Sequence, residues 1–199
     1  MLDPQWVFLS AVLGLAGSVR YAFATARGAA RPNVVTWALW AAVPLIGFSA
    51  QLDAGVGLPA VQTLAAGAGP VAVVACGLLT RHILVRISGF DKVCAAVAAV
   101  ALVVWLVLEH APLAVVCVVV ADAAAALPTL VKAWRDPYSE NLLFYVLVGI
   151  GAGVTLMTIT SWEPESWAFA AYVFALCAVL GGTVFIRRRV LQQPGPGPA

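Results

Sequence analysis

An aspartate inside an apolar stretch is the residue best suited to chemistry in this chain. Asp122 lies about ten residues into the apolar segment 112–133. A carboxylate at mid-membrane costs about 2.5–3.5 kcal/mol on insertion scales, so such a residue usually faces the inside of a helix bundle. Ala125, Ala126 and Thr129 follow one and two turns later and leave room on that face. Asp122 therefore suits proton coupling; a structural carboxylate, paired or permanently protonated, is the alternative.

Arg20 is the natural partner for this aspartate, because it lies within another apolar segment, 5–27. An ion pair between Arg20 and Asp122 would offset the burial of both charges. Two alternatives stay open. The side chain of Arg20 could extend to the interface, two turns away at Arg27, or it could join Arg27 and Arg31 in a basic stripe at a water-filled opening.

Polar residues, aromatic residues and a helix-kinking proline recur every three or four positions on one face of segment 34–51, beginning just before it: Asn33, Thr36, Trp37, Trp40 and Pro44. Asn141, Tyr145 and Gly149 stand in a similar pattern in segment 141–160. Aromatic rings with an amide could hold a small polar ring or a zwitterion; an interfacial or packing role is the alternative. The predicted solute-binding residues are Trp40, Tyr145, Asn141, Thr36 and Thr129. The predicted gating residues are Pro44, Gly149 and Pro128.

No pattern of metal-binding or catalytic residues accompanies these positions. The four cysteines, Cys76, Cys94, Cys117 and Cys177, fall inside apolar runs without CxxC or CxxH spacing. Catalysis in a membrane usually shows histidines, acids or cysteines clustered on facing segments, and the sequence has no such cluster. We therefore expect neither an enzyme nor a cofactor nor a bound metal.

The elements that carry these residues are predicted to be membrane-spanning helices. Of the 199 residues, 63% are hydrophobic and 10% charged, and the mean hydropathy is +0.99, whereas a soluble domain is about half apolar and a quarter charged. A spanning helix needs about 20 mostly apolar residues. Seven segments qualify: 5–27, 34–51, 58–80, 92–109, 112–133, 141–160 and 166–186.

The charges predict the orientation. With seven spans, nearly all basic residues fall on one side: Arg27, Arg31, Arg81, Arg86, Lys92, Lys132, Arg135, Arg187, Arg188 and Arg189. The other side carries Asp3, Asp53, Glu109, Glu163 and Glu165 and no basic residue. By the positive-inside rule the basic side is cytoplasmic. We therefore expect a multi-pass protein of the bacterial inner (plasma) membrane, with the N-terminus outside and the C-terminus in the cytoplasm.

A weak internal repeat divides the chain. Shifting the first three spans by 105 positions places Arg27 on Lys132, Pro32 on Pro137, Trp40 on Tyr145 and Pro44 on Gly149. We predict an all-α membrane protein with two parallel three-helix repeats joined by a linker helix, in a 3+1+3 order. The expected units are a first repeat at 1–83, a loop and linker helix at 84–110, a second repeat at 111–189 and a disordered tail at 190–199.

This arrangement resembles the SWEET and PQ-loop (MtN3-like) superfamily of seven-helix membrane proteins. The local match is 127–140, LPTLVKAWRDPYSE, in which a proline near a helix end precedes a basic turn and a serine; Thr129 stands where the family has glutamine. The string RPNVVTWALW at 31–40 is similar to an uncharacterised bacterial branch. The resemblance implies a substrate site between the two halves.

The sequence therefore favours a secondary transporter or facilitator of a small polar solute, such as a sugar, an amino acid or a related metabolite. Proton coupling through Asp122 would fit this role. The alternative is a membrane receptor or binding protein that uses the same central cavity without transport. The expected partners are the solute and membrane lipids, with no nucleic acid; a homo-oligomer is compatible with the sequence.

Overall fold

The chain folds into seven α-helices, described here from a computed structural model for residues 2–85, 87–108 and 111–192. They are α1 (Val7–Ala26), α2 (Val34–Asp53), α3 (Ala60–Thr80), α4 (Gly89–Leu108), α5 (Ala111–Arg135), α6 (Leu142–Thr158) and α7 (Pro164–Gln192). Two 3-10 turns, η1 (Pro4–Trp6) and η2 (Pro137–Ser139), precede α1 and α6. No strand forms within these ranges, which confirms the predicted all-helical class.

Each predicted span coincides with one helix to within a few residues, apart from the end of the last. Helix α7 continues past the predicted end at 186 to Gln192, so the first part of the predicted tail is helical rather than disordered. Residues 193–199 of that tail, and Arg86 and Glu109 of the charge pattern, lie outside the described residues.

The helices fit a multi-pass membrane protein. Five of them are long and apolar enough to cross a bilayer within the described part of the chain: α1 with η1, α2, α3, α5 and α7. Helix α6 is apolar but shorter. Large apolar side chains are exposed along the helices, as lipid contact requires, and include Val12, Val19 and Phe23 on α1.

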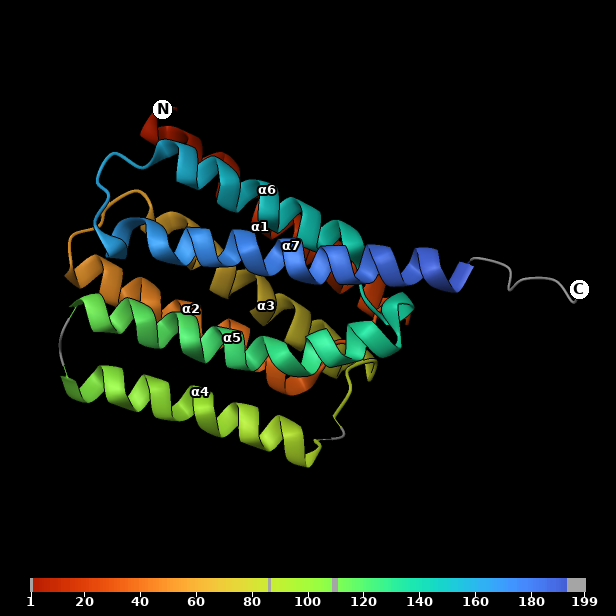
Figure 1. Ribbon diagram of the computed structural model, residues 1–199. Helices are drawn as coiled ribbons and strands as arrows, with labels where there is room; N and C mark the ends of the chain where they lie inside the picture. The colour runs from red at the N-terminus through yellow and green to blue at the C-terminus, as the bar shows by residue number, and fades with distance from the viewer. Residues whose placement is uncertain (1, 86, 109–110, 193–199) are drawn as a thin grey trace, which may run out of the picture.

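Both ends of the bundle carry features of a membrane interface. Successive helices run in opposite directions, so the connections alternate between two ends (Figure 1). Exposed tryptophans lie at each end: Trp6 and Trp162 at one, Trp134 at the other. Tryptophan and tyrosine are enriched at membrane–water interfaces. The arginines and lysines of the loops share the end of Trp134, which we call the basic end.

The helices pack in a regular pattern. Helix α3 lies between α1 and α2, and α7 lies between α5 and α6. Helix α1 packs against α6, and α2 packs against α5. Helix α4 lies at the edge of the bundle, mainly against α5 (Figure 1). Six helices therefore surround a common interior, while α4 stays outside it.

Side-chain caps explain where α2 and α4 begin. The Asn33 side-chain oxygen accepts from the backbone N–H groups of Val35 and Thr36, at 2.9 and 3.1 Å. Ser88 and Asp91 bond reciprocally as a capping box for α4. The amide of Asn33 also donates to the Asp91 carboxylate at 2.9 Å, which ties the start of α4 to the start of α2.

Candidate functional site

A narrow cavity lies at the centre of the bundle, where the six inner helices meet. Its volume is about 60 Å³, comparable to about two water molecules at liquid density. The walls come from α1, α2, α3, α5, α6 and α7, and include Ser10, Trp40, Gln62, Asp122, Tyr145 and Cys177. Pro44 and Pro70 also line it, each inside a helix whose backbone ladder loses one hydrogen bond. The space is thus bordered by the points of α2 and α3 at which the helical hydrogen bonding is interrupted.

Asp122 is the acidic group of the cavity. Its residue surface is 3% exposed, and the Tyr172 hydroxyl of α7 donates to its Oδ2 at 2.8 Å. The burial agrees with the cost of a carboxylate at mid-span, which favours an inward orientation. Asp122 is therefore held by a neutral donor and presents its other oxygen to neighbours or solute.

Two further polar groups of the cavity wall have no hydrogen-bond partner among the described residues. They are the hydroxyl of Ser10 on α1 and the indole N–H of Trp40 on α2, which lies near the Asp122 carboxyl without meeting the geometry of a hydrogen bond. Leaving a buried donor unsatisfied costs about 1–3 kcal/mol. Such groups call for water or a ligand, so the cavity wall can supply hydrogen bonds to a polar guest.

An aromatic cluster lies between the cavity and the basic end. Trp37 packs on Tyr21 with ring centroids 4.3 Å apart, on Phe144 at 5.1 Å and on Trp40 at 5.4 Å. Phe144 and Tyr145 are 5.1 Å apart. Tyr21 and Trp37 are fully buried. These rings, from α1, α2 and α6, close the interior on that side.

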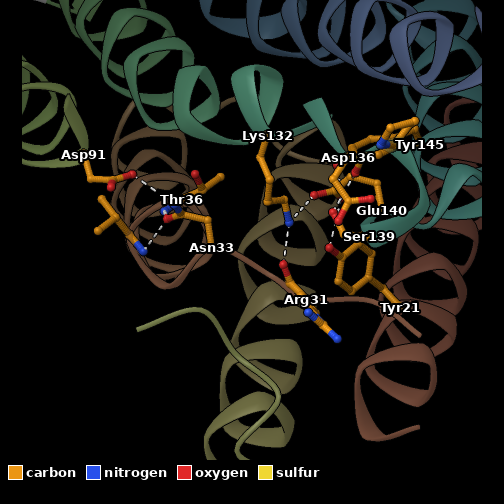
Figure 2. Close-up of polar contacts among 12 residues, drawn as sticks. Tyr21, Arg31, Asn33, Thr36, Asp91, Lys132, Asp136, Ser139, Glu140 and Tyr145 are labelled. Atoms are coloured by element: carbon orange, nitrogen blue, oxygen red, sulfur yellow. Dashed lines mark hydrogen bonds and ion pairs between the residues drawn. The ribbon is translucent and has the colours of Figure 1, made fainter. Parts of the chain in front are cut away.

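Beyond the rings lies a buried ionic network centred on Glu140 (Figure 2). Its Oε2 accepts from the hydroxyls of Tyr21 and Tyr145, at 2.9 and 2.7 Å. Its Oε1 lies 2.5 Å from the Lys132 ammonium, and the Glu140 side chain has no exposed surface. Lys132 also donates to the carbonyl of Arg31. The network thereby joins α1 and the α1–α2 loop to α5 and α6; we call it the Glu140 latch.

The predicted ion pair between Arg20 and Asp122 is not made. Ser10, Gly14 and Ser18 follow each other at intervals of four and turn one face of α1 toward the cavity. Arg20 is two positions after Ser18, about 200° further round the helix. Its side chain is exposed and lines a groove on the outside of the bundle. Asp122 bonds to Tyr172 instead.

The other predicted binding and gating residues divide into three groups. Trp40, Tyr145 and Pro44 line the cavity. Thr36, Thr129 and Pro128 are buried in α2 and α5 without lining it, and the hydroxyls of both threonines lack a partner among the described residues. Asn141 caps α6 and, with Gly149, lies on outer grooves. The offset between the caps Asn33 and Asn141 is 108 positions, not 105, so Trp40 and Tyr145 do not hold equivalent places in their helices.

Sequence reasoning missed Tyr172 and the latch. Tyr172 reads as an ordinary aromatic of a span, and no spacing links it to Asp122. The sequence does offer a signal for Glu140, because it is an acidic residue in a loop on the basic side of the protein, eight positions after Lys132. Comparison with family models, with curated proteins and with solved structures finds no match to this chain.

Proposed function

We propose that this protein is a membrane transporter or facilitator of a small polar solute, which it carries through the central cavity. The observation that carries the proposal is the combination within that cavity of the buried Asp122 carboxyl with the unpartnered donors of Ser10 and Trp40. Ligand sites typically combine mostly apolar walls with a few convergent polar groups. A hydroxylated or zwitterionic solute fits these groups.

The packing supports a 3+1+3 architecture of the SWEET and PQ-loop kind. Exchanging α1, α2 and α3 with α5, α6 and α7 turns each of the main contacts among these six helices into another main contact. The α1–α6 interface becomes α2–α5, and the central position of α3 becomes that of α7. Such symmetry is expected of two parallel repeats with a site at their junction, with α4 as the linker. By the positive-inside rule the basic end is cytoplasmic, in a bacterial inner membrane, and the N-terminus is outside.

The Glu140 latch would act as the gate at the basic end. It connects residues of both proposed halves, namely Tyr21 and the Arg31 carbonyl of the first with Lys132, Glu140 and Tyr145 of the second. A cavity of about 60 Å³ is too small for a sugar or an amino acid. Transport therefore requires the halves to separate, and the latch must break for release at the basic end.

Asp122 would couple this motion to protons. A protonated Asp122 is neutral and can donate to a solute, whereas the carboxylate can only accept. Its partner Tyr172 is neutral, so no fixed cation holds the carboxyl in the charged form. Solute and proton would then share one site and move together.

The test uses the purified chain in proteoliposomes. A thermal-shift screen of sugars, amino acids and related metabolites first identifies solutes that bind. Uptake of a binding solute is then measured with and without an imposed pH gradient. We expect Asp122→Asn to abolish the response to the pH gradient. Asp53 is an exposed aspartate at the end of the bundle opposite the basic end, so Asp53→Asn should keep the response. Unchanged pH dependence in Asp122→Asn would refute coupling. Binding without flux for every solute would favour a receptor.

A further inference from the structure

A groove of about 530 Å³ lies outside the bundle at the basic end, between α1 and the start of α6. It is separate from the central cavity. Three arginines line it: Arg20 and Arg27 from α1 and Arg188 from α7. Tyr138 and Asn141 add polar groups, and Ala24, Leu142, Leu143 and Val146 form the apolar part.

The charge of this groove is not neutralised by the protein. Glu140 also lines it, but the carboxylate of Glu140 is bonded inside the latch by Lys132 and the two tyrosines. Arg188 is fixed by bonds to the carbonyls of Pro137 and Glu140, at 3.1 and 2.6 Å, and lies over the Tyr138 ring. Arg20 and Arg27 make no side-chain hydrogen bond or salt bridge to any described residue. Their combined charge attracts an anion.

The position of Arg20 points to a ligand from the membrane. It lies seven residues before Arg27, about 10 Å from the end of α1. Its neighbours on the surface of α1, Val19 and Phe23, are exposed apolar residues, 50% and 57% accessible. An arginine at this depth needs a counter-charge or water. A phospholipid phosphate supplies that charge at the interface, which Tyr138 marks at this end.

The apolar surface beside the arginines continues toward the middle of the bundle. Leu143, Val146 and Ile150 recur at three- and four-residue intervals on α6 and are 44–52% exposed. Val12, Leu15 and Val19 form a comparable strip on α1. A lipid tail can lie along these strips while its head group meets the arginines, which a free phosphate ion would not require.

We propose that the groove is a binding site for an anionic phospholipid, with the phosphate held by Arg20, Arg27 and Arg188 and an acyl chain along α1 and α6. Such basic pockets on the cytoplasmic side of a bundle suit anionic head groups, at about 1 kcal/mol per basic residue near the surface. This lipid site is independent of the proposed transport function.

Native mass spectrometry of the full chain in detergent tests the site. The probes are phosphatidylglycerol, phosphatidylcholine and inorganic phosphate. We expect the wild type to retain one phosphatidylglycerol in preference to phosphatidylcholine. Arg20→Gln with Arg27→Gln should weaken its retention about twenty-five-fold, roughly a factor of five per arginine. Both side chains are exposed, so the variant should fold, which circular dichroism verifies.

The matched control removes two other arginines of the basic end, Arg135→Gln with Arg189→Gln, which are exposed and do not line the groove. This variant should bind within about twofold of the wild type. Equal loss in both variants would overturn the proposal in favour of diffuse charge attraction. Unchanged binding in Arg20→Gln with Arg27→Gln would overturn it too. Displacement of the lipid by millimolar inorganic phosphate would indicate a soluble-anion site instead.

Discussion

Removing the cation of the Glu140 latch should destabilise the protein more than removing the whole ion pair. In Lys132→Met the Glu140 carboxylate keeps the two tyrosine hydroxyls on Oε2 but loses its only salt-bridge partner among the described residues. The carboxylate cannot reach water, because the side chain has no exposed surface. Leaving one partner of a buried pair uncompensated costs about 3–5 kcal/mol.

The double variant, Lys132→Met with Glu140→Gln, removes both charges. The glutamine oxygen can still accept from Tyr21 and Tyr145, whereas the Arg31 carbonyl loses its bond from Lys132. Replacing a buried ion pair by neutral groups of similar volume is often nearly neutral. We therefore expect the order wild type, double variant, Lys132→Met, from most to least stable.

The assay is thermal unfolding of the purified chain in one detergent at one scan rate. For about 200 residues, 1 kcal/mol shifts the midpoint by about 2–4 °C. Lys132→Met should therefore unfold about 6–20 °C below the wild type, and the double variant should recover most of that loss. A midpoint for Lys132→Met equal to or above that of the double variant would refute a buried, structurally required ion pair.

Three other results are expected. If the latch closes the basic end, Lys132→Met with Glu140→Ala, which removes the tyrosine, lysine and Arg31-carbonyl contacts of the latch, should raise the reactivity of Cys177, a cavity residue, toward a membrane-impermeant thiol reagent added at that end; this is measured in a chain whose other cysteines are alanine. Gly151→Ala should cost about 1–3 kcal/mol of unfolding free energy, because a Cβ there would lie 2.9 Å from the Ser10 carbonyl oxygen, whereas Gly182→Ala, which meets nothing within 4 Å, should cost little. Burial raises the pKa of Asp91, but hydrogen bonds from Ser88 and Asn33 lower it by more, so its pKa lies below its ordinary value. Those bonds therefore stabilise the fold above about pH 4 and are lost as the pH falls further; thermal midpoints across pH 3–7 should show this loss in the wild type and less of it in Asp91→Asn.

The helices could be predicted because hydropathy and length report the environment of a whole segment. The end of α7 could not, since three consecutive arginines look like the end of a span. Tertiary contacts extend the helix there. Arg187 bonds to the carbonyl of Trp134 at 2.9 Å and lies over its ring, and Arg188 bonds two more carbonyls. Cations also favour a helix C-terminus.

The inward orientation of Asp122 could be predicted from the cost of a carboxylate in lipid, but the identity of its partner depends on helix rotation. The same cost suggested Arg20 as the counter-charge. Small residues, Gly14 and Ser18, decide which face of α1 meets the cavity, and that face excludes Arg20. An arginine side chain is long enough to reach the membrane interface, whereas an aspartate side chain is not. Arg20 therefore does not require Asp122 as a counter-charge, although Asp122 requires a hydrogen-bond partner inside the bundle.

The latch lies where the proposed repeat departs from its own spacing. Pro32 and Pro137 are 105 positions apart, whereas the caps Asn33 and Asn141 are 108 apart. The three additional residues lie between Pro137 and Asn141, where the chain forms η2 and reaches Glu140. They include Glu140, whose carboxylate accepts from the hydroxyls of Tyr21 and Tyr145. A constant offset cannot reveal this, because it assumes that the two halves match at every position. The first half has no acid in its corresponding loop, so in the proposed 3+1+3 arrangement one asymmetric insertion would supply the gate.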